Sequence, residues 1–279
     1  MAEWFDGTIM ANGINVHYLR TGGDKPPLVL SHGFTDNGSC WARVAQSLEA
    51  DYDVIMPDAR GHGLSDATET GYSPEELAAD LKAFILALGL VNPGLMGHSM
   101  GAGTTAVTAA TYPEIARWVI LEDPPWTDAS LPPAAREALN KVTLDKAMER
   151  RQMTREELLN LLRERHPHWA AIELDSWVDS KRQLSPLALQ RSSGIGRDWR
   201  EDARRITCPT LLIAADQERM DPGSDNRPLE GIVNRAVASE AVSLNPRIQV
   251  VFIREAGHSI RRDQFKSFME AIVAFLAET

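Results

Sequence analysis

The sequence predicts an α/β protein with a doubly wound, mostly parallel β-sheet and helices on both faces. Short apolar runs, typical of buried parallel strands, alternate along the chain with helical patterns. The 279 residues suffice for one large domain with an insertion, and a hydrophobic content of 43% can fill a sizeable core. The predicted strands cover residues 7–10, 14–19, 27–31, 54–56, 94–97, 118–121, 210–214 and 249–253.

Local signals support the individual elements. The first two strands should form an antiparallel hairpin, because Asn12 and Gly13 between them make a typical two-residue turn. The segment 73–76, Ser-Pro-Glu-Glu, is typical of a helix start, with a capping serine and acids in the first turn. The helix that follows is predicted over residues 77–88 and ends at Gly89.

The alternation is interrupted between residues 126 and 200, where helical patterns cover residues 134–146, 154–165 and 170–184. The interruption lies between two predicted core strands and contains four tryptophans, which need a surface to bury them. We therefore expect a core of residues 1–125 and 201–279, and a helical cap (lid) of residues 126–200 over a pocket. The four tryptophans are Trp126, Trp169, Trp177 and Trp199. Trp126 directly follows a strand end and is the candidate substrate-binding residue.

The segment 97–101, Gly-His-Ser-Met-Gly, is typical of a nucleophile elbow. A serine hydroxyl is a poor nucleophile at neutral pH, so it must project from a tight strand-to-helix turn towards a base. A predicted strand precedes this segment, an Ala/Thr-rich helix over residues 102–110 follows it, and the two glycines leave room for the bend. These features predict that Ser99 is the nucleophile.

Two further segments complete the expected chemistry. Residues 30–34, Leu-Ser-His-Gly-Phe, end an early strand, and backbone N–H groups at such a turn can stabilise an oxyanion. Phe34 and Met100 are the candidate donors of this oxyanion hole, and the Phe34 ring is a second candidate for substrate binding. His258 lies on a short loop after the last predicted strand, at the edge of the sheet where Ser99 is expected, and is the candidate general base.

Composition excludes several other classes of function. The net charge of −10 argues against nucleic-acid binding, and the pair Arg261 and Arg262 is expected to begin a solvated helix. Cys40 and Cys208 fit neither a disulfide framework nor a metal site, so both should be reduced. We expect no metal, no cofactor, no membrane segment and a cytoplasmic location, with a small molecule as the partner. The sequence leaves the oligomeric state open.

Together these motifs resemble the α/β-hydrolase fold family across nearly the whole chain, in family order. The resemblance rests on residues 32–34, 58–63, 97–101 and 257–258. It implies a sheet of about eight strands and a Ser-acid-His triad in chain order. The family also contains epoxide hydrolases and haloalkane dehalogenases, whose nucleophile is an aspartate, and Ser99 argues against both.

The resemblance leaves the triad acid open between two positions. Many relatives place an aspartate after the strand predicted here over residues 210–214, where Glu218 stands and Asp216 is a weaker candidate. Another branch places the acid after the strand that follows the elbow helix, where Asp123 stands before two prolines that would stiffen the turn. We favour Asp123, with Glu218 as the alternative.

The expected function is that of an esterase-like or lactonase-like serine hydrolase, which cleaves a carboxylic ester or lactone through an acyl-enzyme. The cap tryptophans favour an apolar or aromatic substrate. The same triad supports amide hydrolysis, carbon–carbon bond hydrolysis and perhydrolysis, so these alternatives remain. A different class of function, a small-molecule receptor with slow turnover, also occurs on this fold.

Overall fold

The computed structural model describes residues 4–127, 133–191, 197–216 and 231–279. Within these ranges eight strands form one sheet, in the order β1-β2-β4-β3-β5-β6-β7-β8. The strands are β1 Phe5–Ala11, β2 Ile14–Arg20, β3 Pro27–Ser31, β4 Asp53–Pro57, β5 Gly94–His98, β6 Trp118–Glu122, β7 Thr210–Ala215 and β8 Ile248–Ile253. Strands β3 to β8 run parallel, and β2 pairs antiparallel with both β1 and β4. The predicted eight-stranded, mostly parallel sheet is confirmed.

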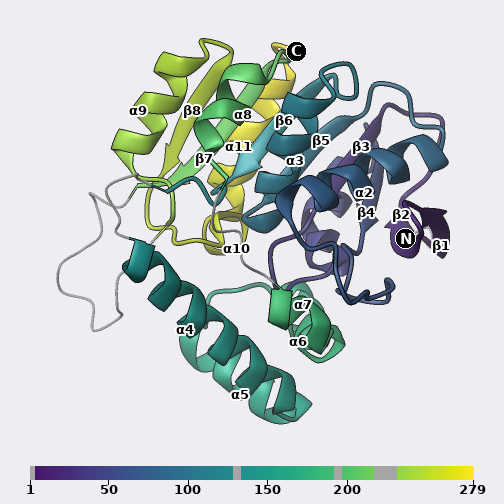
Figure 1. Cartoon of the computed structure of the whole chain (residues 1–279), viewed down its shortest axis with the longest axis vertical. Coiled ribbons are helices and arrows are strands. Elements are labelled where there is room, and N and C mark those ends of the chain that lie inside the picture. Colours follow the sequence, from purple (N-terminus) through teal and green to yellow (C-terminus); the bar gives the residue numbers. More distant parts are fainter. Residues whose placement is uncertain (1–3, 128–132, 192–196, 217–230) are drawn as a thin grey trace.

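Helices cover both faces of this sheet (Figure 1). The core helices are η1 Gly38–Trp41, α1 Ala42–Leu48, α2 Pro74–Ala87, α3 Met100–Thr111, α8 Trp199–Arg205, α9 Arg235–Leu244, α10 Ile260–Asp263 and α11 Phe265–Leu276. Four further helices, α4 Pro133–Gln152, α5 Arg155–Arg165, α6 Ala171–Gln183 and α7 Pro186–Arg191, lie together outside these layers. We call α4 to α7 the cap.

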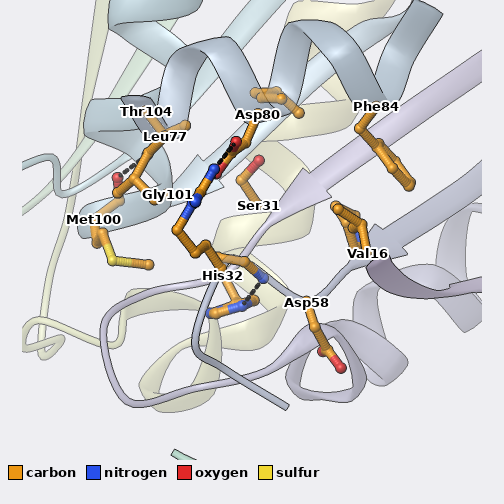
Figure 2. A pocket seen from close by; sticks show the side chains of 14 residues that line it. Val16, Ser31, His32, Asp58, Leu77, Asp80, Phe84, Met100, Gly101 and Thr104 are labelled. Carbon is orange, nitrogen blue, oxygen red and sulfur yellow. Dashed lines mark hydrogen bonds and ion pairs between the residues drawn. The ribbon is translucent and has the colours of Figure 1, made fainter. Parts of the chain in front are cut away.

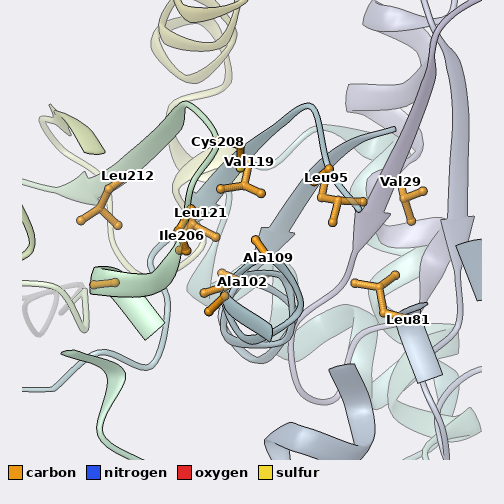
Figure 3. Packing of buried hydrophobic residues seen from close by; sticks show 14 of the residues in the cluster. Val29, Leu81, Leu95, Ala102, Ala109, Val119, Leu121, Ile206, Cys208 and Leu212 are labelled. Atoms are coloured by element: carbon orange, nitrogen blue, oxygen red, sulfur yellow. The ribbon is translucent and has the colours of Figure 1, made fainter. Parts of the chain in front are cut away.

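Alternate residues of the central strands bury their side chains on opposite faces, as the two-residue period of a strand requires. Leu95 and Leu121 join the cluster formed with α2, α3, α8 and α9, part of which Figure 3 shows. Their neighbours Met96 and Ile120 join the cluster formed with α1 and α11. All four are fully buried, and burying each such side chain contributes about 1.5–3 kcal/mol. This two-sided burial holds the strand ends that carry the site.

Most local predictions agree with the structure. Asn12 and Gly13 have φ of 48° and 78° in the β1–β2 turn. At the start of α2, the Ser73 hydroxyl accepts a hydrogen bond from the Glu76 amide. The first helix predicted for the cap, over residues 134–146, is too short, because α4 continues to Gln152. The six-residue α7 and the seven-residue α8 were not predicted, because elements of two turns or less hardly establish a helical period.

The cysteine and membrane predictions can be compared with the described ranges. Cys40 and Cys208 are both free, as expected, and both are also buried. Within these ranges no helix combines the length and the hydropathy needed to cross a membrane.

A pH-dependent contribution to stability is expected from His17 on β2, whose ring bridges two carboxylates. Its Nδ1 lies 2.7 Å from Asp58 and its Nε2 lies 2.9 Å from Asp6. The hydrogen bond to Asp58 raises the pKa of His17 above its ordinary 6.5, although burial opposes this. A raised folded-state pKa adds stability that is fully present below the unfolded pKa and is lost as pH rises through the folded pKa.

The free energy of unfolding of the wild type should therefore fall between about pH 6 and about pH 9 more than that of His17→Gln. Urea titration of both proteins at both pH values measures the difference. Parallel losses in the two proteins would show that His17 contributes nothing to this pH dependence. The comparison cancels contributions from other titrating groups.

Candidate active site

Ser99 lies at the junction between β5 and α3, as the elbow motif predicts. Its φ of 51° and ψ of −117° place it in a region that residues with a side chain rarely adopt and that costs about 1–3 kcal/mol. Small neighbours make the turn possible, because a Cβ on Gly97 would lie 2.3 Å from the carbonyl oxygen of Gly101. The Ser99 amide donates to the Glu122 carbonyl oxygen at 2.9 Å. These contacts fix a strained turn that presents the serine at the end of the sheet.

His258 and Asp123 come together from the ends of β8 and β6. The His258 Nδ1 lies 2.6 Å from Asp123 Oδ2. The Asp123 carboxylate is fully buried and also accepts hydrogen bonds from the amides of Ile232 and Val233, at 2.8 Å and 2.9 Å. These donors fix the carboxylate, so the ring that it binds is also held in one orientation.

The electrostatics of this pair suit a general base. Burial lowers the pKa of His258, but the hydrogen bond that its ring donates to Asp123 and the negative charge of Asp123 outweigh burial and raise this pKa above 6.5. A neutral histidine that donates from Nδ1 keeps Nε2 as an acceptor. The ring can therefore accept a proton at Nε2 while Asp123 stabilises the imidazolium that forms.

The two predicted oxyanion donors flank the serine. Met100 is the first residue of α3 and directly follows Ser99. On the other side, a Cβ on Gly33 would lie 3.4 Å from the Ser99 Cβ, and Phe34 is the next residue. Ser99, Met100, Phe34 and His258 are all partly exposed among buried neighbours. Each of the four residues thus keeps part of its surface accessible to solvent.

The elbow leaves no room for a side chain at Gly101. A Cβ there would lie 2.1 Å from the Ser31 carbonyl oxygen, a backbone atom that cannot move without shifting the end of β3. Gly101→Ala should therefore lower the free energy of unfolding by about 1–3 kcal/mol and reduce activity. In the same helix, a Cβ on Gly103 meets only the Pro125 side chain, at 3.0 Å.

Gly103→Ala is therefore the matched control, and thermal melting of both variants measures the contrast. Equal melting temperatures for the two would contradict the proposed packing of the elbow.

The sequence also predicts two alternative acids and two pocket residues. Glu218 lies outside the described residues. Asp216 pairs instead with Arg235 Nη2 at 2.7 Å. Trp126 is 2% exposed and stacks on Trp199 in the core cluster, with ring centroids 5.0 Å apart, so its ring packs the junction between core and cap. The Phe34 ring packs against an apolar cluster that the cap forms together with Tyr72.

The histidines of the cap also have structural partners. His166 stacks on Trp169, and His168 Nε2 lies 3.3 Å from Asp263 Oδ1. In the parts of the chain that the structure describes, no three His, Cys, Asp or Glu side chains converge as metal ligands would.

A separate small cavity of about 50 Å³ lies behind the elbow (Figure 2). Its lining comes from β2, α2, α3, the ends of β3 and β4 and the loop after β4. It includes Met100 and the ion pair of Arg60 with Asp80, but neither Ser99 nor His258. This volume is large enough for water but is well below the several hundred Å³ of ordinary ligand pockets. The cavity is therefore not a candidate for the pocket of the predicted nucleophile and base.

Sequence reasoning missed a buried ionic cluster beside the site. Its six members are Asp36, Glu122, Glu173, Lys181, Arg261 and Arg262. The prediction that Arg261 and Arg262 begin a solvated helix is wrong, because their exposed fractions are 0% and 3%. Both arginines pair with Asp36, which lies far away in the sequence. Their position directly after the His258 loop is the one local signal that could have suggested a role near the site.

Comparisons with known proteins agree with this fold. The family model for the alpha/beta hydrolase fold matches residues 26–260. The N-formylmaleamate deformylase of Pseudomonas putida is 30% identical over 275 residues, covering 97% of this chain and 96% of that protein. The 2-(acetamidomethylene)succinate hydrolase of Mesorhizobium japonicum is 27% identical, covering 92% and 90% of the two chains. A crystal structure of a Pseudomonas putida N-formylmaleamic acid deformylase has a TM-score of 0.77 at 26% identity, covering 96% of this chain and 100% of that chain.

Proposed function

Because the chain belongs to the α/β-hydrolase fold family, we propose that it is a serine hydrolase with Ser99, His258 and Asp123 as its catalytic triad. The observation that carries the proposal is the 2.6 Å contact between His258 and the buried Asp123, next to a serine held in a strained elbow. A nucleophile, a base and an oriented acid are the three parts that this chemistry needs.

In the proposed mechanism, the Ser99 Oγ attacks the acyl carbon of the substrate while His258 Nε2 takes the hydroxyl proton. The amides of Phe34 and Met100 stabilise the oxyanion of the tetrahedral intermediate. His258 then gives its proton to the leaving group as the acyl bond breaks, and an acyl-enzyme remains. A water molecule, deprotonated by His258, attacks the acyl-enzyme and releases the carboxylic acid with free Ser99.

The proposed substrate is a small molecule with a carboxylic ester or lactone bond. Its acyl group is apolar or aromatic, because the Phe34 ring lies between the proposed oxyanion turn and the apolar side chains of the cap. A second candidate is an N-acyl amide bond. It is favoured by the two relatives that match at least nine-tenths of this chain, since the names of both denote N-acyl compounds.

A panel of esters, lactones and N-acyl amides, followed over many turnovers, tests the proposal. The panel should contain matched pairs that share one acyl group and differ only in an oxygen or nitrogen leaving group. Stoichiometric labelling with a fluorophosphonate should stop all turnover, because this reagent phosphonylates an activated serine. The ester-to-amide ratio of kcat/KM then identifies the bond. Ligand binding without labelling or turnover would overturn the proposal and favour a receptor.

A further inference from the structure

Lys181 lies in the ionic cluster and links the cap directly to the turn after β3. It is on α6 and only 2% exposed, and its Nζ lies 2.8 Å from Asp36 Oδ1 and 2.8 Å from the Thr35 carbonyl oxygen. A third contact, to the Ser180 hydroxyl at 3.2 Å, uses the last donor of the ammonium group. The buried cation is therefore fully satisfied by acceptors on two parts of the molecule.

The turn that Lys181 holds has an unusual backbone. Thr35 has φ of 68°, which is a genuine outlier for a β-branched residue. The turn is closed by a hydrogen bond from the Asp36 amide to the Gly33 carbonyl oxygen at 3.0 Å. Gly33 lies against Ser99, so the strained turn begins beside the nucleophile. A strained backbone of this kind persists only where its surroundings hold it.

The other cations of the cluster share Asp36 with Lys181, but each also has a carboxylate partner of its own. Arg261 pairs with Glu122 at 3.0 Å, and Arg262 pairs with Glu173 at 3.1 Å. Both also pair with the Asp36 side chain. Although burial favours the neutral acid, the charges of Arg262, Lys181 and Arg261 hold the pKa of Asp36 well below its usual range. Within this cluster, the contact to the Thr35 carbonyl oxygen is made by Lys181.

We propose that Lys181 is a positioning residue for the oxyanion hole. By holding the Thr35 carbonyl oxygen and Asp36, it keeps the turn in its strained form and presents the Phe34 amide to the oxyanion beside Ser99. The cap thereby contributes to transition-state stabilisation as well as covering the site. This inference rests on the proposed function, because it assigns Phe34 the role of an oxyanion donor.

Lys181→Met is the main test, with Glu173→Gln as its matched control. The control weakens another buried ion pair between cap and core but leaves the contacts of the turn in place. For Lys181→Met we expect kcat to fall about 30-fold, with KM within about threefold of the wild type, because a misplaced oxyanion donor acts on the transition state. Glu173→Gln should stay within about threefold in both constants.

A boronic acid inhibitor separates positioning from general damage. Its boron accepts the Ser99 oxygen to form a tetrahedral adduct, while the serine proton passes to His258, so the adduct has an oxygen in the oxyanion hole. Its inhibition constant should rise in Lys181→Met by about the same factor as kcat falls, while that of the carboxylic acid product changes little. Equal weakening of both ligands, or no change in either, would overturn the inference.

Lys181→Arg keeps the positive charge beside Asp36. It replaces Lys181→Met as the test variant if the methionine variant does not fold. Its planar guanidinium cannot reproduce the three short contacts of the ammonium group, so weaker boronate binding with little change in KM is expected. Unchanged boronate affinity in this variant would also overturn the inference. A wild type that neither turns over esters or amides nor binds the boronate would instead overturn the proposed function.

Discussion

Replacing Ser99 by alanine is expected to lower kcat/KM by about 10⁴-fold to 10⁶-fold, because the only atom lost is the attacking Oγ. The change keeps a Cβ at the elbow, so the melting temperature should stay close to that of the wild type. Steady-state kinetics on the best substrate of the panel measures the loss. Fluorophosphonate labelling of the same sample should disappear.

Ser47→Ala is a suitable control for the Ser99 experiment. Ser47 is an exposed helical serine whose hydroxyl donates to the Arg43 carbonyl oxygen, and its loss should leave turnover and labelling unchanged. If Ser99→Ala kept a tenth of the activity, the nucleophile would have to be another group.

Replacing Asp123 by asparagine is expected to lower kcat by about 10⁴-fold, the size of the effect when a triad loses its charged acid. The amide cannot stabilise the imidazolium, and it favours the wrong tautomer of His258.

The pH profile of Asp123→Asn gives a second signature. Asp123 raises the pKa of His258, and kcat/KM falls as pH drops through that pKa because a protonated ring cannot accept the serine proton. The acidic limb of the remaining activity should therefore move to lower pH.

Two controls distinguish Asp123 from the other acids considered. Asp216→Asn alters a carboxylate that pairs with Arg235, and Glu218→Gln alters the alternative position from the sequence. Both variants should keep most of their activity. Loss of turnover in Glu218→Gln together with an active Asp123→Asn would move the triad acid to Glu218.

Local features of this chain were the most predictable from the sequence. The elbow around Ser99 needs small residues at fixed spacing, and the β1–β2 turn needs residues that accept a positive φ, so both are encoded within a few neighbouring positions. Asp123 was harder to assign, because its role depends on the amides of Ile232 and Val233, more than 100 positions away.

Arg261 shows most clearly where sequence patterns fail. Two adjacent arginines normally indicate a solvent-exposed segment, yet the Arg261 side chain is fully buried. Its guanidinium carbon lies 4.2 Å from the centre of the Trp41 ring, and it forms ion pairs with Glu122 and Asp36. Burial of a charge is decided by whether partners arrive from elsewhere in the fold, and that information is absent from the local sequence. Trp126 is an apolar example of the same limit. Its stacking partner, Trp199, lies more than 70 positions away in the sequence, so the local sequence does not show that the ring packs where the core meets the cap.

The ionic cluster also bears on the order in which the chain can fold during synthesis. Asp36 and Glu122 are made long before Arg261 and Arg262, and their full set of counter-charges exists only once the last segment has arrived. Until then, closing the sheet around them would leave Glu122 without its partner and Asp36 with Lys181 alone, and an unpaired charge in a dry interior costs several kcal/mol. The ribosome-bound chain should therefore keep this end of its sheet open and hydrated. The ionic cluster should then form and become buried in one late, cooperative step.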